Sequence, residues 1–301
     1  MTTGALFVEP IEITGDLLVS TNVDGSLDPA AWDVAHTYGA GDQATVGDAI
    51  YQSMQAANTG HDVTLVEDPP WWVRVGAINA LRMFDHRIGA QTENAESIEV
   101  VISPGQIIDL VSLRNVQALT VRLQQTSPSV EGVVYDKTIS LDDPVADWFE
   151  YFFSPVTFRT DALFPGLLPI TDSLFSLFAR YPAGTAKIGE LIMGPALDAG
   201  IAEAGVQDGI DDYSTITADE FGVRDIVERD FADNMEATVW VQAARSGTLR
   251  RLLTANRARP ILFIPVTLRA DAQVYGLAES WRRTLSYPGM DVFSITMKGL
   301  T

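Results

Sequence analysis

The side chains best suited to chemistry are few and scattered in this sequence. The histidines are His36, His61 and His86, and they show neither the HExxH pattern nor an i, i+4 spacing that would place two rings on one helical face. Cysteine is absent, which excludes disulfides and thiolate metal sites. We therefore interpret all three histidines as surface or linker residues and predict no metal site.

Carboxylates offer a second source of chemistry. Asp142 and Asp143, with Glu150, could be imagined as the paired acids of a glycosidase. Residues 22–25 and 208–212 faintly resemble calcium loops, but the remaining ligand positions are missing. Acidic pairs are frequent in so acidic a chain, and no GxSxG, P-loop or GxGxxG motif is present. The sequence therefore predicts no catalytic residues, no cofactor and no enzyme.

Charge and hydropathy narrow the choice of partners. The 301 residues include 40 acidic and 20 basic ones, for a formal charge of −20. Nucleic acids and anionic membranes require clustered lysine and arginine, which occur only within residues 245–259. The longest apolar candidate, residues 163–178, is interrupted by two prolines and an aspartate, and the N-terminus lacks the features of a signal peptide. We expect synthesis in the cytoplasm, no membrane insertion and no nucleic-acid partner.

Large aromatic residues are concentrated in residues 28–76, for which we predict a separate module. In order they are Trp32, Tyr38, Tyr51, Trp71 and Trp72. This order, with Gly-Asp after the first tyrosine, resembles the small chitin-binding type of carbohydrate-binding module. A module of this size is too small for an aliphatic core, so most rings are expected to fill its interior. The alternative is that one or two are exposed and stack on sugar rings.

Residues 77–200 carry many short alternating segments separated by turns. Such spacing is typical of an antiparallel β-sandwich. Residues 186–194 resemble a late strand of a galactose-binding-like jelly roll. The expected strands include residues 98–102, 119–123, 133–135, 148–153, 174–180 and 188–194.

For the last segment, residues 201–301, the pattern predicts a β-rich domain with one helix. Residues 235–242 alternate like a strand, and residues 246–259 then follow a helical period with Leu249, Leu252 and Leu253 on one face. Pro260 ends this helix. Further strands are expected at residues 261–264, 274–285 and 291–298, so the predicted fold class is mainly β and multi-domain.

Several short motifs in this domain resemble tail-tip and baseplate proteins of tailed bacteriophages. They are residues 228–231 (Glu-Arg-Asp-Phe), 275–276 (Tyr-Gly), 286–288 (Ser-Tyr-Pro) and 297–300 (Met-Lys-Gly-Leu). Residues 79–85 (Asn-Ala-Leu-Arg-Met-Phe-Asp) give a second match, because a similar run links an aromatic module to a β-sandwich in such proteins.

The resemblance implies a distal-tail-like structural protein located in the virion. Residues 1–27 would pack with the C-terminal domain and help to build an oligomeric ring. The partners would be other copies, other tail or baseplate proteins, and host-surface polysaccharide. The alternative is a carbohydrate-binding adhesin or receptor-binding protein.

Charge patterning suggests how copies could join. Acidic residues dominate residues 208–233, including Asp211 and Asp212, whereas Arg250, Arg251 and Arg257 point away from the apolar face of the helix. Opposite charges at a contact would let identical acidic copies assemble head to tail. Two alternatives remain open from the sequence. The acidic run could pair with the helix inside one copy, or it could form a simple solvated acidic face.

Overall fold

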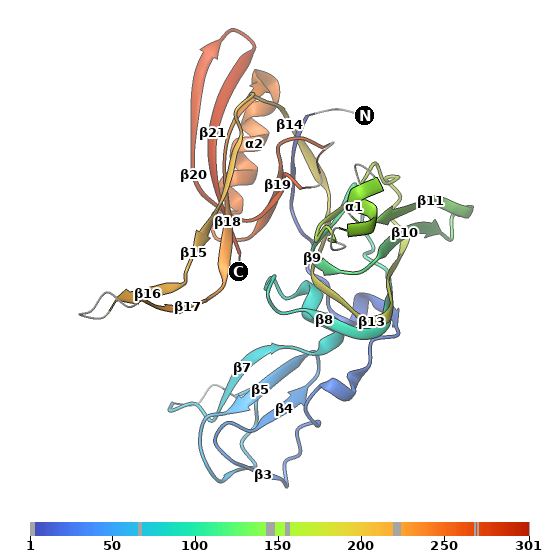
Figure 1. Ribbon diagram of the computed structural model, residues 1–301, viewed down its shortest axis with the longest axis vertical. Helices are drawn as coiled ribbons and strands as arrows, with labels where there is room; N and C mark the ends of the chain where they lie inside the picture. The colour runs from blue at the N-terminus through green and yellow to red at the C-terminus, as the bar shows by residue number, and fades with distance from the viewer. Residues whose placement is uncertain are drawn as a thin grey trace.

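The computed structural model describes residues 4–65, 68–142, 148–153, 157–218, 224–267, 269 and 271–300, without the side chains of residues 150, 151, 286 and 287. Figure 1 shows two large β-structures side by side, with small sheets extending from them. The prediction of a mainly β, antiparallel, multi-sheet chain is confirmed. Within the described part of the chain, no helix is long and apolar enough to cross a membrane.

The first large structure, here called the barrel, is a seven-stranded sheet whose path closes because β14 pairs with both β1 and β18. Helix α2 (Ala243–Ala255) packs against it and contributes Leu249 and Leu253 to its core. In sheet order the strands are β14 (Ala196–Ala202), β1 (Ala5–Val8), β19 (Ile261–Ile264), β20 (Val274–Tyr287), β21 (Met290–Gly299), β18 (Phe231–Gln242) and β15 (Gln207–Asp212).

The second large structure is the sandwich, in which β13 belongs to both layers. A register shift between Arg180 and Thr185 divides this strand. Its first half pairs with β10 and β8, and its second half pairs with β9 and, over residues 185–188, also with β8. The strands are β11 (Val130–Ser140), β10 (Thr120–Ser127), β13 (Leu174–Gly194), β8 (Thr92–Ile102), β2 (Leu18–Thr21), β9 (Leu110–Gln117) and β12 (Ala162–Pro165).

The apolar run of β19 explains how the barrel and the sandwich meet. Side chains of a strand alternate between its two faces. Ile261 and Phe263 enter the barrel core, while Leu262 and Ile264 join a second apolar cluster that includes Leu110 of the sandwich. A strand buried on both faces needs an uninterrupted apolar sequence, which is what residues 261–264 supply.

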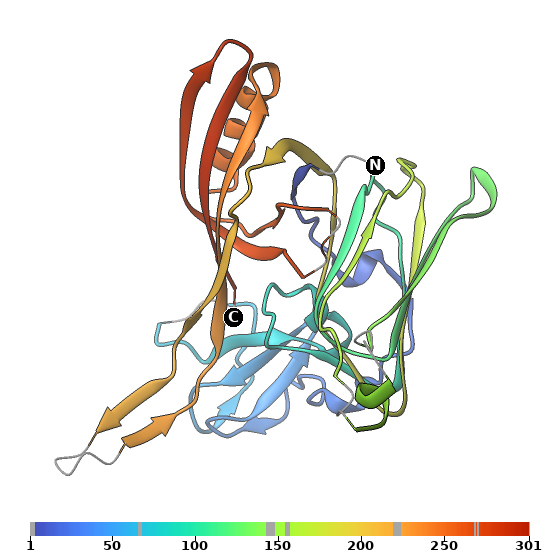
Figure 2. The same cartoon turned by 45° about the horizontal axis from the view of Figure 1, so that its top comes forward.

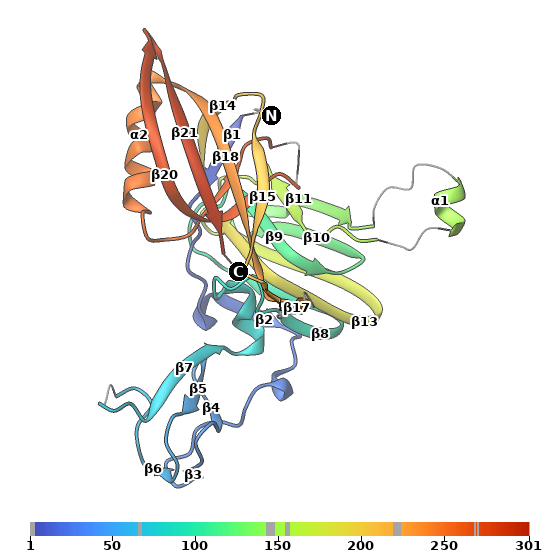
Figure 3. The ribbon, with the colours of Figure 1, turned by 60° about the vertical axis from the view of Figure 1, so that its left-hand side comes forward.

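The remaining elements are short. The aromatic module, residues 28–76, lies beyond the sandwich and has its own buried cluster (Figure 3). Its strands are β3 (Thr37–Tyr38), β4 (Gln43–Val46), β5 (Ala49–Ser53), β6 (Asn58–Thr59) and β7 (Trp72–Ala77). A two-stranded ribbon, β16 (Thr215–Ala218) and β17 (Arg224–Val227), continues from β15 and β18; the other elements are α1 (Trp148–Phe153), η1 (Gly15–Leu17), η2 (Gly25–Leu27) and η3 (Asn79–Phe84).

Several local predictions need correction. Residues 148–153 were expected to form a buried strand, but they form α1, which stands apart from the sheets in Figure 3 and leaves Trp148 73% exposed. The strands expected at residues 174–180 and 188–194 are one strand, β13, because the turn between them is only a bulge. In the N-terminal segment, β1 pairs with β14 and β19 of the barrel, whereas β2 pairs with β8 of the sandwich.

Candidate functional site

An extended β-ribbon, here called the arm, leaves the lower end of the barrel (Figures 1 and 2). It consists of β15 paired with the first residues of β18, followed by β16 paired with β17. Residues 215–217 (Thr-Ile-Thr) of β16 are β-branched and favour extended backbone, whereas β15 is rich in aspartate. The acidic run of residues 208–233 thus contains most of β15, all of β16 and β17, and the start of β18.

The end of the arm exposes large apolar side chains. Ile216 and Ile226 are cross-strand partners on one face, 62% and 64% exposed, and Val227 lies exposed on the other face. Nearer the barrel, Ile210 and Phe231 are also exposed. A two-stranded ribbon without a covering layer is marginal in water, and clustered exposed apolar residues mark interaction sites. The arm thus has the properties of a contact element.

The acidic candidates on the arm keep their negative charge. Asp211 accepts a hydrogen bond from Asn234 Nδ2 at 2.8 Å and pairs with Lys298 at 3.3 Å, and these contacts lower the pKa of its carboxyl. Asp212 accepts a hydrogen bond from the backbone of Ser214 at 2.8 Å, and hydrogen bonds from this serine lower its pKa as well. Asp212 is therefore an exposed anion at neutral pH, whereas Asp211 is half-buried and already engaged by Asn234 and Lys298.

Helix α2 presents the opposite charge. Leu249 and Leu253 are buried against the barrel and Leu252 is half-buried, as the helical period had predicted. Arg250, Arg251 and Arg257 are exposed on the remaining surface, and none of them forms an ion pair with another described residue. The helix ends at Ala255 and not at Arg259 as predicted, so it carries Arg245, Arg250 and Arg251, and Arg257 and Arg259 lie in the turn that follows. Residues 243–259 contain no acidic residue, so this region is positively charged on an acidic protein.

The structure does not bring these two candidate surfaces together within one chain. Helix α2 packs on β14, β18 and β21 in the upper half of the barrel, whereas the arm extends from the lower end (Figure 1). Among the described residues, no hydrogen bond or ion pair joins Asp211 or Asp212 to an arginine of α2. Pairing of the acidic run with the helix inside one copy is thus not observed.

The five aromatic candidates of the module separate into two groups. Tyr38 and Trp72 are buried, 6% and 8% exposed, and their rings meet edge to face at 4.9 Å. They build the core of the module and offer no free ring face to a sugar. Trp32, Tyr51 and Trp71 are half-buried and pack around this core.

Trp71 has the most suitable geometry for stacking. Its ring lies against His61 with centroids 3.8 Å apart and planes only 12° from parallel. The backbone carbonyl of His61 also accepts a hydrogen bond from Trp72 Nε1 at 2.9 Å, which fixes His61 next to the core. A flat, half-exposed ring pair of this kind can provide a platform for a sugar ring.

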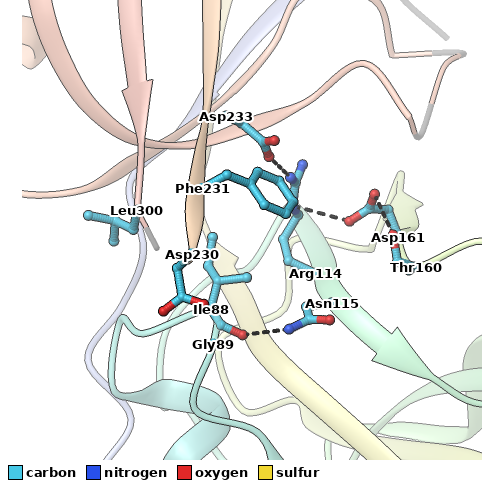
Figure 4. Close-up of a pocket in the computed structure, with 10 residues that line it drawn as sticks. All are labelled: Ile88, Gly89, Arg114, Asn115, Thr160, Asp161, Asp230, Phe231, Asp233 and Leu300. Atoms are coloured by element: carbon cyan, nitrogen blue, oxygen red, sulfur yellow. Dashed lines mark hydrogen bonds and ion pairs between the residues drawn. The ribbon is translucent and has the colours of Figure 1, made fainter. Parts of the chain in front are cut away.

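A cavity of about 300 Å³ lies where the base of the arm meets the sandwich (Figure 4). Arg114 of β9 points into it, is nearly buried, lies 3.1 Å from Asp161, and donates hydrogen bonds to Asp233 of β18 and to the backbone carbonyl of Gln273. Burial raises the pKa of Asp161. Since carboxylates already surround the guanidinium, the cluster acts as a structural connection between sandwich and barrel.

The histidine interpretation needs correction at one position. His86 is half-buried, and its Nδ1 lies 3.3 Å from Glu190 Oε1 and 2.6 Å from the hydroxyl of Tyr275. Little in the sequence points to this group, because its members are far apart in the chain. The available signal was a charged residue inside an apolar run: Glu190 within residues 186–194, and likewise Arg114 within residues 110–116.

The glycosidase and calcium hypotheses gain no support. Asp142 accepts a hydrogen bond from Ser140, Asp143 lies outside the described residues, and the side chain of Glu150 is not described. Residues 208–212 form most of strand β15, and Asn22 bonds to Ser97. Across the part of the chain that the structure describes, no group of three or more histidine or acidic side chains is arranged to hold a metal ion.

Comparison with known proteins identifies no family for this chain. No protein-family model and no curated protein matches the chain. A partial structural match exists to the crystal structure of chitosan-binding module 1 from a chitosanase/glucanase of Paenibacillus sp. IK-5, with 11% sequence identity, a TM-score of 0.26, and coverage of 38% of this chain and 84% of that chain. A similarity at this score carries no argument about what this chain binds, and the resemblance to tail-tip proteins stays a prediction.

Proposed function

We propose that this protein is a structural subunit of a bacteriophage tail tip or baseplate, and that its copies form a ring in which the arm of one copy contacts the next. The observation that carries the proposal is the arm itself, whose apolar side chains Ile216 and Ile226 are exposed and have no cover from the described residues. Assembly of identical subunits would provide that cover. The resemblance of the C-terminal motifs to tail-tip proteins supplies the setting.

Charge complementarity supports α2 of the neighbouring copy as the surface that receives the arm. The described arm carries Asp208, Asp211, Asp212, Asp225, Glu228 and Asp230 against Arg224 and Arg229. Helix α2 carries only positive charge. Copies of net charge −20 repel one another unless opposite charges meet at the contact, so an acidic arm on a basic helix favours head-to-tail closure.

In this proposal the protein has no enzymatic activity, cofactor or nucleic-acid partner. It is made in the host cytoplasm and incorporated into the virion, where other tail or baseplate proteins are its further partners. The positively charged surface is too limited for a phosphate backbone and is reserved for neighbouring subunits.

Removal of the outer part of the arm, β16 and β17, tests the proposal directly. Asp212 pairs with Phe231 in register, so residues 213–230 can be replaced by an Asn-Gly turn that closes the hairpin at that pair. We expect the full chain to form discrete oligomers by light scattering and rings by electron microscopy, and the shortened chain to stay monomeric and folded. A wild-type chain that is monomeric at every concentration, alone and with tail proteins, would contradict the proposal.

A second candidate function is carbohydrate binding through the aromatic module, in an adhesin or receptor-binding protein. The stacked, half-exposed pair of Trp71 and His61 favours it. Retention of the full chain on insoluble chitin and on a host-surface glycan array, lost in Trp71→Ala but kept in an assembly-defective variant, would support this function. If the chain binds no glycan, the carbohydrate-binding function is refuted, and the proposed structural role is not affected.

A further inference from the structure

The barrel and the sandwich are held together by a mostly apolar contact with a titratable edge. The apolar part is a cluster from both structures: Val8, Leu110, Leu163, Ile192, Leu262, Ile264 and Tyr275. On the same face of β13 as Ile192 lies Glu190, which is 1% exposed and faces Arg114 of β9 in register. Charged groups are therefore buried next to the surface along which the two structures meet.

Three elements contribute to the hydrogen bonds at this edge. His86 follows η3, Glu190 belongs to β13 of the sandwich, and Tyr275 belongs to β20 of the barrel. His86 Nδ1 is the shared atom, 3.3 Å from Glu190 Oε1 and 2.6 Å from the Tyr275 hydroxyl. The second carboxylate oxygen of Glu190 is buried and has no hydrogen-bond partner among the described residues.

One nitrogen cannot satisfy both neighbours when Glu190 is ionised and His86 is neutral. A bare Nδ1 accepts the Tyr275 proton but then faces the carboxylate with lone pair against lone pair. A protonated Nδ1 can donate to Glu190, but then the Tyr275 hydroxyl loses its acceptor. A proton on Oε2 of Glu190 weakens this conflict, because Nδ1 can then accept from Tyr275 beside a neutral carbonyl oxygen in place of an anionic one. It also removes the buried charge.

We propose that His86, Glu190 and Tyr275 form a proton-dependent latch between the sandwich and the barrel, closed while the His86–Glu190 pair holds an extra proton and loosened when that proton leaves. The inference rests on the geometry of this contact and is independent of the proposed function.

The electrostatic surroundings agree with the latch. Burial raises the pKa of Glu190 to about 7, and the hydrogen bond from His86 opposes this rise. The hydrogen bond with Glu190 raises the pKa of His86. Asp85 and Glu12 also act on His86, Asp85 acts on Glu190 as well, and Arg114 lies opposite Glu190 in register. Arg74 and Arg87 act on Asp85.

The sign of the effect follows from these directions. The pKa values of His86 and Glu190 are both higher in the folded state than in the unfolded chain. The latch therefore binds more protons when folded than the same residues do in the unfolded chain. The contribution of the latch to stability is complete at a pH below the pKa values of the unfolded chain. It is lost as the pH rises through the pKa values of the folded state, which is about 7 for Glu190. The latch therefore closes on the acidic side and opens on the alkaline side.

The absence of cysteine makes a direct test simple. Val133 of β11 and Leu285 of β20 are exposed, so Val133→Cys with Leu285→Cys places one spin label on the sandwich and one on the barrel of the full chain. Distances are measured by electron–electron double resonance from about pH 5.5 to about pH 8.5, which brackets the ordinary titration of histidine. We expect a narrow distribution in acid that broadens with a midpoint near pH 7.

Three variants decide the outcome. Glu190→Gln should keep the narrow distribution at every pH, because its side chain stays neutral. His86→Asn, chosen because residue 86 has φ of 62° and asparagine tolerates that region, should move the midpoint to higher pH by removing a group that lowers the pKa of Glu190. Glu93→Gln, at the half-exposed pair with Lys187, is the control and should leave the midpoint unchanged.

Two results would overturn the latch. One is a wild-type distribution that does not change across the pH range. The other is a transition that keeps its midpoint in both Glu190→Gln and His86→Asn, with circular dichroism confirming that each variant is folded.

Discussion

The arm and the aromatic module both extend from the two large β-structures, but they differ in where their apolar side chains lie. The module is small, yet it buries Tyr38 and Trp72 in a core of its own. The arm has no core, and Ile216 and Ile226 lie exposed on a two-stranded ribbon. The module is complete by itself, whereas the described part of the arm lacks a covering layer. Under the proposals made above, the module would bind a ligand on its surface and the arm would contact another protein.

The largest expected effect concerns the apolar end of the arm. Ile216→Thr with Ile226→Thr keeps β-branched side chains and adds no charge, so the ribbon should persist while its apolar face is lost. We expect assembly to fall to the level of the shortened arm, measured by light scattering. Thr215→Ser with Thr217→Ser, on the opposite face, is the control; equal loss in both pairs would show that the apolar face is not the contact.

The two adjacent tryptophans of the module give the next effect. Trp72 is buried, so Trp72→Ala should cost about 3–5 kcal/mol, the usual range for removing a large core ring. Trp71→Ala should cost clearly less, because its ring is half-exposed. Hydrogen exchange of the amides of β4 and β5 measures both in the full chain, and equal losses of protection would contradict the division into core and surface rings.

A smaller effect is expected from the charges of α2. Arg250→Glu with Arg251→Glu should weaken assembly and leave the monomer folded, since both side chains are exposed and form no described ion pair. The wild-type contact should also weaken with salt, as exposed charges are screened over about 8–10 Å. Arg180→Glu with Arg282→Glu gives the same charge change outside the helix and serves as control. Assembly that survives the first pair would point to apolar contacts alone.

The sequence was most informative where burial repeats with a regular period. Helix α2 and strand β19 could be predicted from such patterns. The apolar positions of α2 match one face of a helix, and those of β19 occupy both faces of a strand. The pattern failed at residues 148–153, where an aromatic run looks like a core strand but forms an exposed helix. It also could not reveal that His86, Glu190 and Tyr275 meet, because tertiary contacts between distant polar residues leave no periodic signal.

The smallest effect should come from removing the aromatic module. Asp28 and Asn79 lie at its two ends and are joined by a hydrogen bond from Asn79 N to Asp28 Oδ1 of 2.8 Å. The chain can therefore be closed by a short Gly-Ser bridge in place of residues 29–76, with Asp28 and Asn79 kept, and with Ala77 retained because it belongs to the sandwich core. Because the module has its own core, the remainder should retain its melting temperature and its assembly. A remainder that fails to fold would refute separability. A folded remainder that no longer assembles would instead place the module in the ring contact, and the contrast between a complete module and an incomplete arm would no longer hold.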